Sequence, residues 1–234
     1  MSTQTLVIFD IDSTLLRVGN AHAIFSQVYS LVAGRQLQGR LDVAAQPELA
    51  IMEQLRAQLA PTLQVSIGDL TRVYHEQLRL AFQTEPPVVL KGAREILEGL
   101  VQLGGAITFA TGNSRSIANL KMQSAGLGAT LRELNLSFRG GFGDRLVSKT
   151  DIVAAALDDW YESSVCDRSG VIVGDSVQDM IAGRELGIGC VGVCTGASSR
   201  KALVDAGAHS VLESLAPPTR WAAEAILEAA RLTH

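Results

Sequence analysis

Short apolar runs recur along the chain, and each is followed at once by small or acidic residues. A continuous apolar run of four or five residues suits a strand that is buried on both faces of a parallel sheet. Four runs predict such strands, and two weaker ones, at 134–138 and 210–212, are further candidates. The four strong runs are 5–9, 106–110, 171–174 and 190–193.

Helical periodicity fills the segments between these runs. Ser114 and Ser176 are typical N-cap residues, and each helix that they begin is expected to stop near a glycine. A third helix is expected to begin at Thr150, and a terminal one to run from 219 to about 231. The alternation of strands and helices predicts an α/β fold, a doubly wound Rossmann-like parallel sheet.

One segment breaks this alternation. Residues 17–87 contain no convincing buried strand and end at a Glu-Pro-Pro sequence, a natural boundary. We therefore expect an inserted α-helical cap domain at 17–87 and a core domain made of 1–16 and 88–234. A lateral helical subdomain that covers no site is the alternative. The helical stretches within the segment are 20–33, 47–59 and 67–82.

Composition narrows the class of protein. Hydrophobic residues make up 47% and charged residues 19%, which allows a sizeable core and excludes global disorder. The net charge of -4, from 20 basic and 24 acidic residues, argues against nucleic-acid binding. We expect no membrane partner, since the sequence shows neither a signal peptide nor an apolar run long enough to span a bilayer. Three cysteines suggest no disulfide framework, so a cytoplasmic location is expected.

Acidic residues follow two of the predicted strands. Asp10 and Asp12 come after the first run, and Asp175 and Asp179 after the third. In open α/β sheets ligands bind outside the carboxyl ends of the strands, so these four carboxylates are expected to converge. They would need a cation, and ligation by oxygen alone selects a hard one such as Mg²⁺. Taken singly, Asp175 could be a turn residue and Asp179 a first-turn acid favoured by the helix dipole.

Three further residues suit an anion site. Thr111 offers a hydroxyl and Gly112 a backbone N–H at the mouth of a helix, where phosphate is readily bound. Lys149 stands just before another helix and could neutralise a carboxylate and hold a phosphate oxygen. Considered alone, a lysine at a helix start is usually solvated. Lysine is scarce in this chain: the four are Lys91, Lys121, Lys149 and Lys201.

Taken together, the motifs resemble those of the haloacid dehalogenase superfamily, in its phosphoglycolate phosphatase-like branch with a helical cap inserted after the first motif. The first motif, D-x-D-x-T, is matched at 10–14, the second by Thr111, the third by Lys149, and the fourth, G-D-x-x-x-D, at 174–179. Two features depart from the pattern. Ser13 stands where that branch has Gly, and the usual Pro after the third-motif Lys is missing, so Arg145 competes with Lys149 for that role.

The resemblance implies a Mg²⁺-dependent phosphatase that hydrolyses a small phosphomonoester metabolite through an aspartyl-phosphate on Asp10. In the family, Asp12 transfers the proton, Thr111, Gly112 and Lys149 hold the phosphate, and the metal is held by Asp10, the Asp12 backbone carbonyl, Asp175 and, in support, Asp179. Haloacid dehalogenation is disfavoured, because it needs no acid at Asp12.

Two other functions remain open at this point. A phosphomutase of the same scaffold, similar to β-phosphoglucomutase, would pass the phosphoryl group to a second sugar hydroxyl. A receptor or scaffold would bind phosphate without turnover. The expected partner is a small phosphorylated metabolite, and the chain is expected to be a monomer or a small homo-oligomer. Cap residues that could read the leaving group are Arg17, His22, Arg40 and Arg72.

Overall fold

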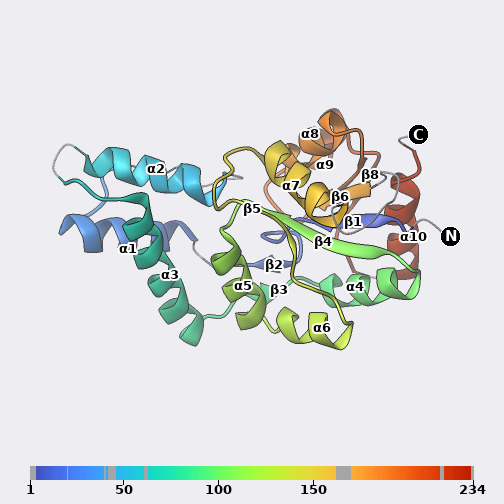
Figure 1. Cartoon of the computed structure of the whole chain (residues 1–234), viewed down its shortest axis with the longest axis horizontal. Coiled ribbons are helices and arrows are strands. Elements are labelled where there is room, and N and C mark those ends of the chain that lie inside the picture. Colours follow the sequence, from blue (N-terminus) through green and yellow to red (C-terminus); the bar gives the residue numbers. More distant parts are fainter. Residues whose placement is uncertain are drawn as a thin grey trace.

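A parallel sheet forms the centre of the molecule in the computed structural model of the chain (Figure 1). The structure describes residues 4–19, 21–39, 41, 46–60, 63–161, 170–216 and 219–232, without the side chains of residues 21, 22 and 219. Within these residues the sheet has six strands in the order β5-β4-β1-β6-β7-β8, all parallel. The strands are β1 (Leu6–Phe9), β4 (Ala106–Thr111), β5 (Gly140–Phe142), β6 (Gly170–Gly174), β7 (Gly189–Val193) and β8 (Ser210–Leu212).

The alternation of side chains along β1 explains why its apolar run is continuous. Val7 and Phe9 pack into one hydrophobic cluster, and Leu6 and Ile8 pack into another on the opposite face of the sheet. All four side chains are fully buried. Successive residues of a strand point to opposite faces, so a strand covered on both sides must be apolar at every position. The predicted fold class is therefore confirmed.

Helices cover both faces of this sheet (Figure 1). One layer is α4 (Ala93–Gln102), α5 (Arg115–Ser124), α6 (Leu127–Glu133) and α10 (Thr219–Ala229). The other is α7 (Lys149–Tyr161), α8 (Val177–Glu185) and α9 (Arg200–Asp205). The predicted N-caps Ser114 and Ser176 do precede α5 and α8.

Three helices lie together beside the core, at the end away from both termini (Figure 1). They are α1 (Ala21–Ala33), α2 (Glu48–Leu59) and α3 (Ile67–Thr84), close to the three predicted stretches. They share a hydrophobic cluster of their own, in which the rings of Phe25 and Tyr74 stack at 4.4 Å between centroids. Ile117 of α5 joins the same cluster, so these helices also pack against the core. A short antiparallel pair that the sequence did not predict, β2 (Leu16–Arg17) and β3 (Val88–Val89), links the two ends of the segment.

The predicted strand at 134–138 is wrong. Asn135 has a positive φ of 53° in the turn after α6, and the strand forms a few residues later as β5. A Cβ at Gly140 would lie 1.9 Å from the Phe109 carbonyl oxygen, so only glycine allows β5 to pair with β4 at this point. The apolar residues Leu134, Leu136 and Phe138 still pack against the core, which is why their pattern imitates a strand.

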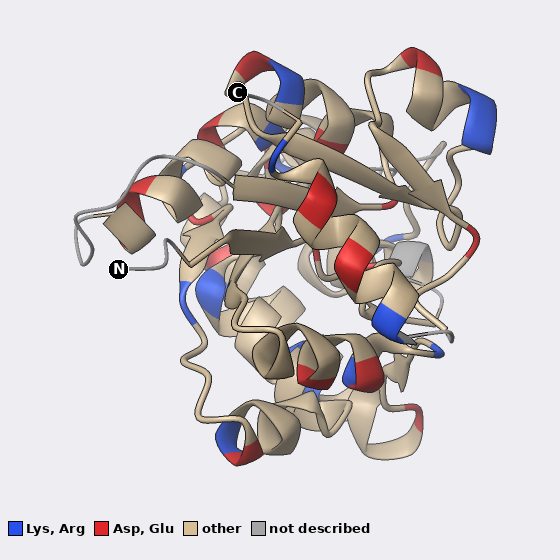
Figure 2. Ribbon diagram, turned by 90° about the vertical axis from the view of Figure 1, so that its right-hand side faces the viewer, with Lys and Arg blue, Asp and Glu red and all other residues tan. Residues whose placement is uncertain are grey.

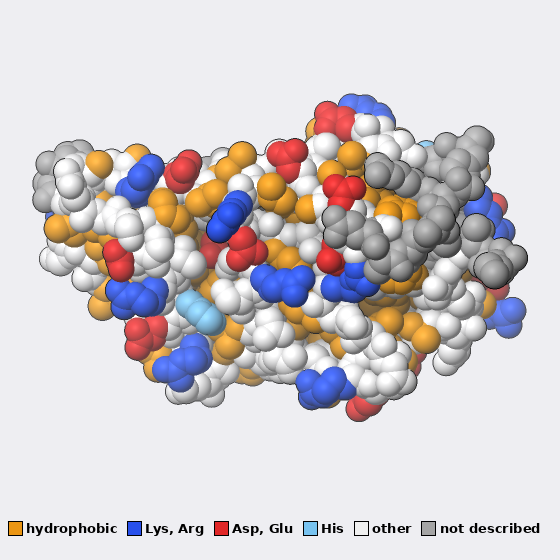
Figure 3. Space-filling model, viewed as in Figure 1, with side chains coloured by type: hydrophobic (Ala, Val, Ile, Leu, Met, Phe, Trp, Pro, Cys, Tyr) orange, Lys and Arg blue, Asp and Glu red, His pale blue; other side chains and the backbone are white. Residues whose placement is uncertain are grey.

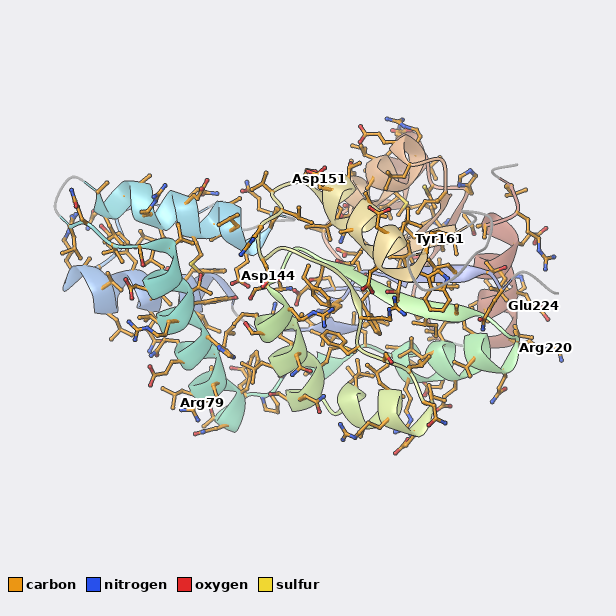
Figure 4. All side chains as sticks on the ribbon, viewed as in Figure 1. Arg79, Asp144, Asp151, Tyr161, Arg220 and Glu224 are labelled. Atoms are coloured by element: carbon orange, nitrogen blue, oxygen red, sulfur yellow. The ribbon has the colours of Figure 1, made fainter. Side chains whose placement is uncertain are left out.

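Acidic and basic residues are interspersed along the ribbon (Figure 2), and their side chains are mixed over the face seen in the space-filling view (Figure 3). On α10, for example, Arg220 pairs with Glu224 one turn later at 2.9 Å (Figure 4). In the described part of the chain, no helix combines the length and the apolar character that a membrane crossing requires. Two of the three cysteines, Cys190 and Cys194, are described and are free thiols.

The contact between β5 and α7 yields a test of the fold. A Cβ at Gly141 would lie 1.8 Å from the Ile152 carbonyl oxygen of α7, a backbone atom that cannot move aside without shifting the helix. We expect Gly141→Ala to lower the free energy of unfolding by about 1–3 kcal/mol, measured by urea denaturation. The matched control is Gly68→Ala in the first turn of α3, where a Cβ meets nothing closer than 3.8 Å. Equal stability of the two variants would contradict this packing.

Candidate active site

The predicted site residues follow strands that are neighbours in the sheet. β1 lies between β4 and β6, so Asp10, Thr111 and Asp175 emerge side by side at the carboxyl edge. The chain builds outward from β1 through β4 to β5 and then returns to the other side of β1 for β6, β7 and β8. Such a reversal is the place where open α/β sheets bind ligands.

Three carboxylates converge at this edge. Asp10, Asp175 and Asp179 each place an oxygen within 4.8 Å of the others. Asp179 is only 1% exposed and stands in the first turn of α8. Its Oδ2 accepts hydrogen bonds from Ser176 N at 3.1 Å and Ser176 Oγ at 2.6 Å, which completes a capping box. The helix cap thus fixes one oxygen of Asp179 and leaves Oδ1 facing the other two carboxylates.

Two glycines allow these carboxylates to approach so closely. A Cβ at Gly174 would lie 2.3 Å from Cγ of Asp179, and one at Gly196 would lie 1.7 Å from Oδ2 of Asp175. Any larger residue would displace the acid. The Gly of the G-D-x-x-x-D motif is therefore required by the space that the last Asp of the same motif occupies.

Lys149 supplies a positive charge in the middle of the cluster. Its Nζ lies 2.6 Å from Asp10 Oδ1, 2.8 Å from Asp179 Oδ1 and 2.9 Å from the carbonyl oxygen of Ala110. Burial by itself would lower the pKa of this amine, but the charges of Asp10 and Asp179 outweigh burial and raise its pKa. Arg145, the competing residue, is exposed. Lys149 is thus the cation that the fold brings to Asp10.

Two threonine hydroxyls lie at the same edge. Thr14 is fully buried and its Oγ1 is 3.3 Å from both Asp10 Oδ2 and Asp175 Oδ1, so it links the first and fourth motifs. Thr111 Oγ1 accepts hydrogen bonds from Asn113 N at 3.3 Å and from Asn113 Nδ2 at 2.8 Å. A hydroxyl that accepts from these nitrogens keeps its own hydrogen free to donate to an anion.

Asp12 departs from the predicted convergence of all four carboxylates. Its side chain is outside the group of three and instead pairs with Lys121, whose Nζ lies 3.0 Å and 2.7 Å from the two carboxylate oxygens. Asn113 Nδ2 donates to the same carboxylate. β1 ends at Phe9, so Asp10 and Asp12 lie beyond the strand, where a spacing of two residues no longer places both side chains on one face.

Sequence reasoning missed Lys121 and Asn113 as site residues. In the sequence Lys121 stands out only as one of four lysines, whereas in the structure it lies on the same face of α5 as the buried residues Ile117, Ala118 and Met122. A lysine on an otherwise apolar helix face was the available signal, because a buried ammonium requires a partner. Asn113 gave no comparable signal, since an asparagine in a loop is common.

A third missed residue, Glu48, joins α2 to the core. Its carboxylate accepts hydrogen bonds from Ser114 N at 3.0 Å and Ser114 Oγ at 3.1 Å, and its own N–H donates to the Gly112 carbonyl at 2.7 Å. Burial raises the pKa of this carboxyl group. Asp144, near this junction in Figure 4, accepts a hydrogen bond from Arg115 N at 3.0 Å. The start of α2 is thereby held against the loop that follows Thr111.

A cavity of about 640 Å³ opens between this helical segment and the sheet edge. Its walls include the acidic cluster and Lys149 on one side and residues of the three helices on the other. From the helices come Phe25, Glu48, Ile51 and Tyr74. A small organic molecule fits a space of this size.

The predicted leaving-group residues have different outcomes. Arg17 is exposed and donates to the Thr195 carbonyl at 3.2 Å. Arg72 is exposed and pairs with Asp69 at 3.0 Å. Neither is among the residues that line the cavity. The side chain of His22 and the whole of Arg40 lie outside the described residues, so these two assignments stay predictions.

The electrostatics of the acidic cluster favour a cation. Burial, together with the charges of Asp179 and Asp175, raises the pKa of Asp10 well above its usual range against the opposing effect of Lys149. Burial and the Asp179 charge raise the pKa of Asp175 to about 7. Asp179 Oδ1 is buried and has Lys149 Nζ at 2.8 Å as its partner, an ammonium that it shares with Asp10. Three converging carboxylates that share a single lysine fit a divalent cation of the kind that prefers oxygen ligands.

This electrostatic balance predicts how metal affects stability. Folded Asp175 holds a proton up to about pH 7, whereas its ordinary pKa is 3.8, so the metal-free protein should lose stability as the pH rises between these values. Mg²⁺ must displace that proton and should therefore stabilise the protein more at pH 8 than at pH 5. Saturating Mg²⁺ should raise the melting temperature at pH 8 by about 5–10 °C, measured by thermal shift against EDTA.

Asp175→Asn should abolish this response, since it removes one of the three ligands. Asp205→Asn, an exposed acid at the end of α9, is the matched control and should keep it. A Mg²⁺ effect that is equal at both pH values, or that persists in Asp175→Asn, would show that the cation binds elsewhere.

The buried carboxylate of Glu48 gives a second prediction. Glu48→Gln would leave one neutral oxygen to accept from Ser114 N and turn the amide NH₂ toward the Ser114 hydroxyl, so two charge-assisted hydrogen bonds are replaced by weaker neutral ones, at a cost of about 1–2 kcal/mol in unfolding free energy. Hydrogen exchange should accelerate in α2 and at the Ser114 amide. Glu53→Gln, an exposed acid on the same helix, should change neither quantity. Identical behaviour of the two variants would argue that the contact does not hold α2.

Part of the chain matches a known protein family. The model of the family described as HAD-hydrolase-like matches residues 151–217, which include Asp175 and Asp179. No curated protein sequence matches the chain.

Solved structures share the fold over nearly the whole chain. A hydrolase from Pseudomonas syringae is 19% identical, with 91% of this chain and 94% of that one covered and a TM-score of 0.63. A protein from Thermotoga maritima, proposed as a β-phosphoglucomutase, is 21% identical, with 98% and 99% covered and a TM-score of 0.62. CbbY from Rhodobacter sphaeroides, in complex with phosphate, is 18% identical, with 92% and 96% covered and a TM-score of 0.69. At these identities the likeness establishes the fold.

Proposed function

We propose that this chain is a haloacid dehalogenase-like hydrolase that acts as a Mg²⁺-dependent phosphatase, and both the family match at 151–217 and the shared fold support this. Its substrate would be a small phosphomonoester metabolite, hydrolysed through an aspartyl-phosphate on Asp10. One observation carries the proposal: Lys149 lies 2.6 Å from Asp10, beside the carboxylates of Asp175 and Asp179. A nucleophile, a fixed cation and a set of metal ligands thus occupy one edge of the cavity.

The described side chains divide the chemistry among them. Asp10 attacks phosphorus and carries the phosphoryl group until water removes it, which replaces one difficult displacement by two easier ones. Lys149 balances charge on the phosphoryl oxygens, and the Thr111 hydroxyl and the Gly112 N–H donate to them. Asp12 gives a proton to the leaving oxygen and later takes one from the attacking water.

Asp10, Asp175 and Asp179 would hold the metal, with the backbone carbonyl of Asp12 as a further ligand. Bound Mg²⁺ would neutralise phosphate charge and align the phosphoryl group. We favour Mg²⁺ because every side-chain ligand in the group is a carboxylate.

The segment 17–87 would act as a cap domain over a core made of 1–16 and 88–234. The separate hydrophobic cluster of α1–α3, the cavity beneath these helices and the Glu48 contact all support this division. A closed cap would exclude bulk water during phosphoryl transfer and select the leaving group.

Structural neighbours suggest which esters to test. CbbY has also been crystallised with xylulose-(1,5)bisphosphate, at 18% identity and a TM-score of 0.69. The Thermotoga maritima neighbour favours the second function, a phosphomutase that returns the phosphoryl group from Asp10 to another hydroxyl of a sugar phosphate. Sugar phosphates therefore join 2-phosphoglycolate as the first compounds to try.

The test is a panel of phosphate esters with purified protein and Mg²⁺. Phosphate release is expected from at least one small ester and from a generic aryl phosphate. Asp10→Asn should reduce the rate roughly a thousandfold or more, because it removes the nucleophile, while circular dichroism remains unchanged. Asp205→Asn, the exposed control, should keep full activity.

A well-folded protein that releases no phosphate from any ester would overturn the phosphatase. Full activity of Asp10→Asn would show that the nucleophile is misassigned. Incubation with a hexose 1-phosphate separates the two functions, because a mutase forms the isomer and a phosphatase forms free phosphate.

A further inference from the structure

Lys121 is a buried lysine for which the proposed chemistry has no role. Its side chain is 6% exposed, whereas that of Lys201 is 83% exposed in a surface pair. It belongs to the last turn of α5, a helix that otherwise buries apolar residues on this face. The ammonium group lines the cavity near the sheet edge.

Three oxygens surround this ammonium. Nζ lies 3.0 Å and 2.7 Å from the two oxygens of Asp12 and 2.8 Å from Oδ1 of Asn113. Asn113 in turn donates through Nδ2 to Asp12 and, at 2.8 Å, to Thr111 Oγ1. Lys121 therefore fixes the Asp12 carboxylate directly and a second time through the asparagine.

The stability of the fold alone does not require an ion pair at this position. Burying an ammonium is costly, and a well-packed apolar residue is often as stabilising as a buried pair. The partner is also only partly buried, with the Asp12 side chain 37% exposed toward the cavity. The pair thus consists of a buried anchor and a carboxylate presented to the site.

We propose that Lys121 is a positioning residue that holds the Asp12 carboxyl group in place for proton transfer to the leaving oxygen; this rests on the proposed phosphatase function. As the bond from Asp10 to phosphorus forms and the ester P–O bond breaks, the Asp12 proton passes to the leaving oxygen and Asp12 remains as a carboxylate. Lys121 contacts neither phosphate nor metal in this scheme. It acts through Asp12.

The test uses esters whose leaving groups differ in how much they need a proton. The alkoxide of an alkyl phosphate is a poor leaving group unless it is protonated, whereas the dinitrophenolate of dinitrophenyl phosphate leaves readily as an anion. We expect Lys121→Met to lower kcat/KM for alkyl esters by roughly a hundredfold and for dinitrophenyl phosphate by about threefold or less, since general acid catalysis is lost only where it is needed. A plot of log kcat/KM against leaving-group pKa should steepen. Because kcat/KM reports the first phosphoryl transfer, later hydrolysis of the aspartyl-phosphate does not obscure the result.

Two reference variants are needed to interpret this plot. Asp12→Asn should give the steepest slope, because it removes the acid itself, and Lys121→Met should lie between it and the unaltered protein. Lys201→Met, at an exposed helix site, should reproduce the unaltered slope. If Lys121→Met does not fold by circular dichroism, Asn113→Ala tests the same network with Lys121 in place and should steepen the slope to a smaller degree.

A loss that is uniform across the esters would make Lys121 merely structural and overturn the inference, as would an unchanged slope in both Lys121→Met and Asn113→Ala. Inactivity of the unaltered protein toward every ester is a distinct result, which overturns the proposed phosphatase and this inference with it.

Discussion

The close approach of three carboxylates to one lysine at the edge of the sheet is the constraint on which the rest of the site depends. Asp10, Asp175 and Asp179 can share this small volume only because Lys149 lies among them and because glycines leave the space. The raised pKa values of Asp10 and Asp175 show that the lysine does not fully balance the burial and repulsion. The arrangement therefore favours a divalent cation and, beside it, an anion that shares the charge.

A second buried pair separates two tasks that the first motif combines. Asp10 faces Lys149 and the acidic cluster, whereas Asp12 faces Lys121 and Asn113. The two acids follow the end of β1 at Phe9, so the alternation of a strand does not hold them to one face, and the left-handed turn at Ser13 then leads the chain into β2. The proposed nucleophile and the proposed proton donor thus have different surroundings, with a different lysine beside each.

The helices over the site are coupled to the loop that would hold phosphate. Glu48 binds Ser114 and the Gly112 carbonyl, so the start of α2 and the residues after Thr111 form one continuous contact. Gly112 has little room, because a Cβ there would lie 2.9 Å from the Cα of Pro47. If α2 moves, it must either break this contact or move the loop after Thr111 with it. Access to the cavity is therefore connected with the geometry of the proposed anion site.

Local sequence signals predicted five of the six described strands of the sheet, most of the helices and the acids at the strand ends, because burial on both faces and helix capping both leave such signals. They did not locate β5, since Leu134, Leu136 and Phe138 pack in a turn with strand-like apolarity. They also could not show that Asp12 pairs with a lysine 109 positions away or that Glu48 pairs with a serine 66 positions away. The packing of α5 and α2 against the sheet brings Lys121 to Asp12 and Glu48 to Ser114. Only the tertiary structure brings such distant charges within hydrogen-bonding distance.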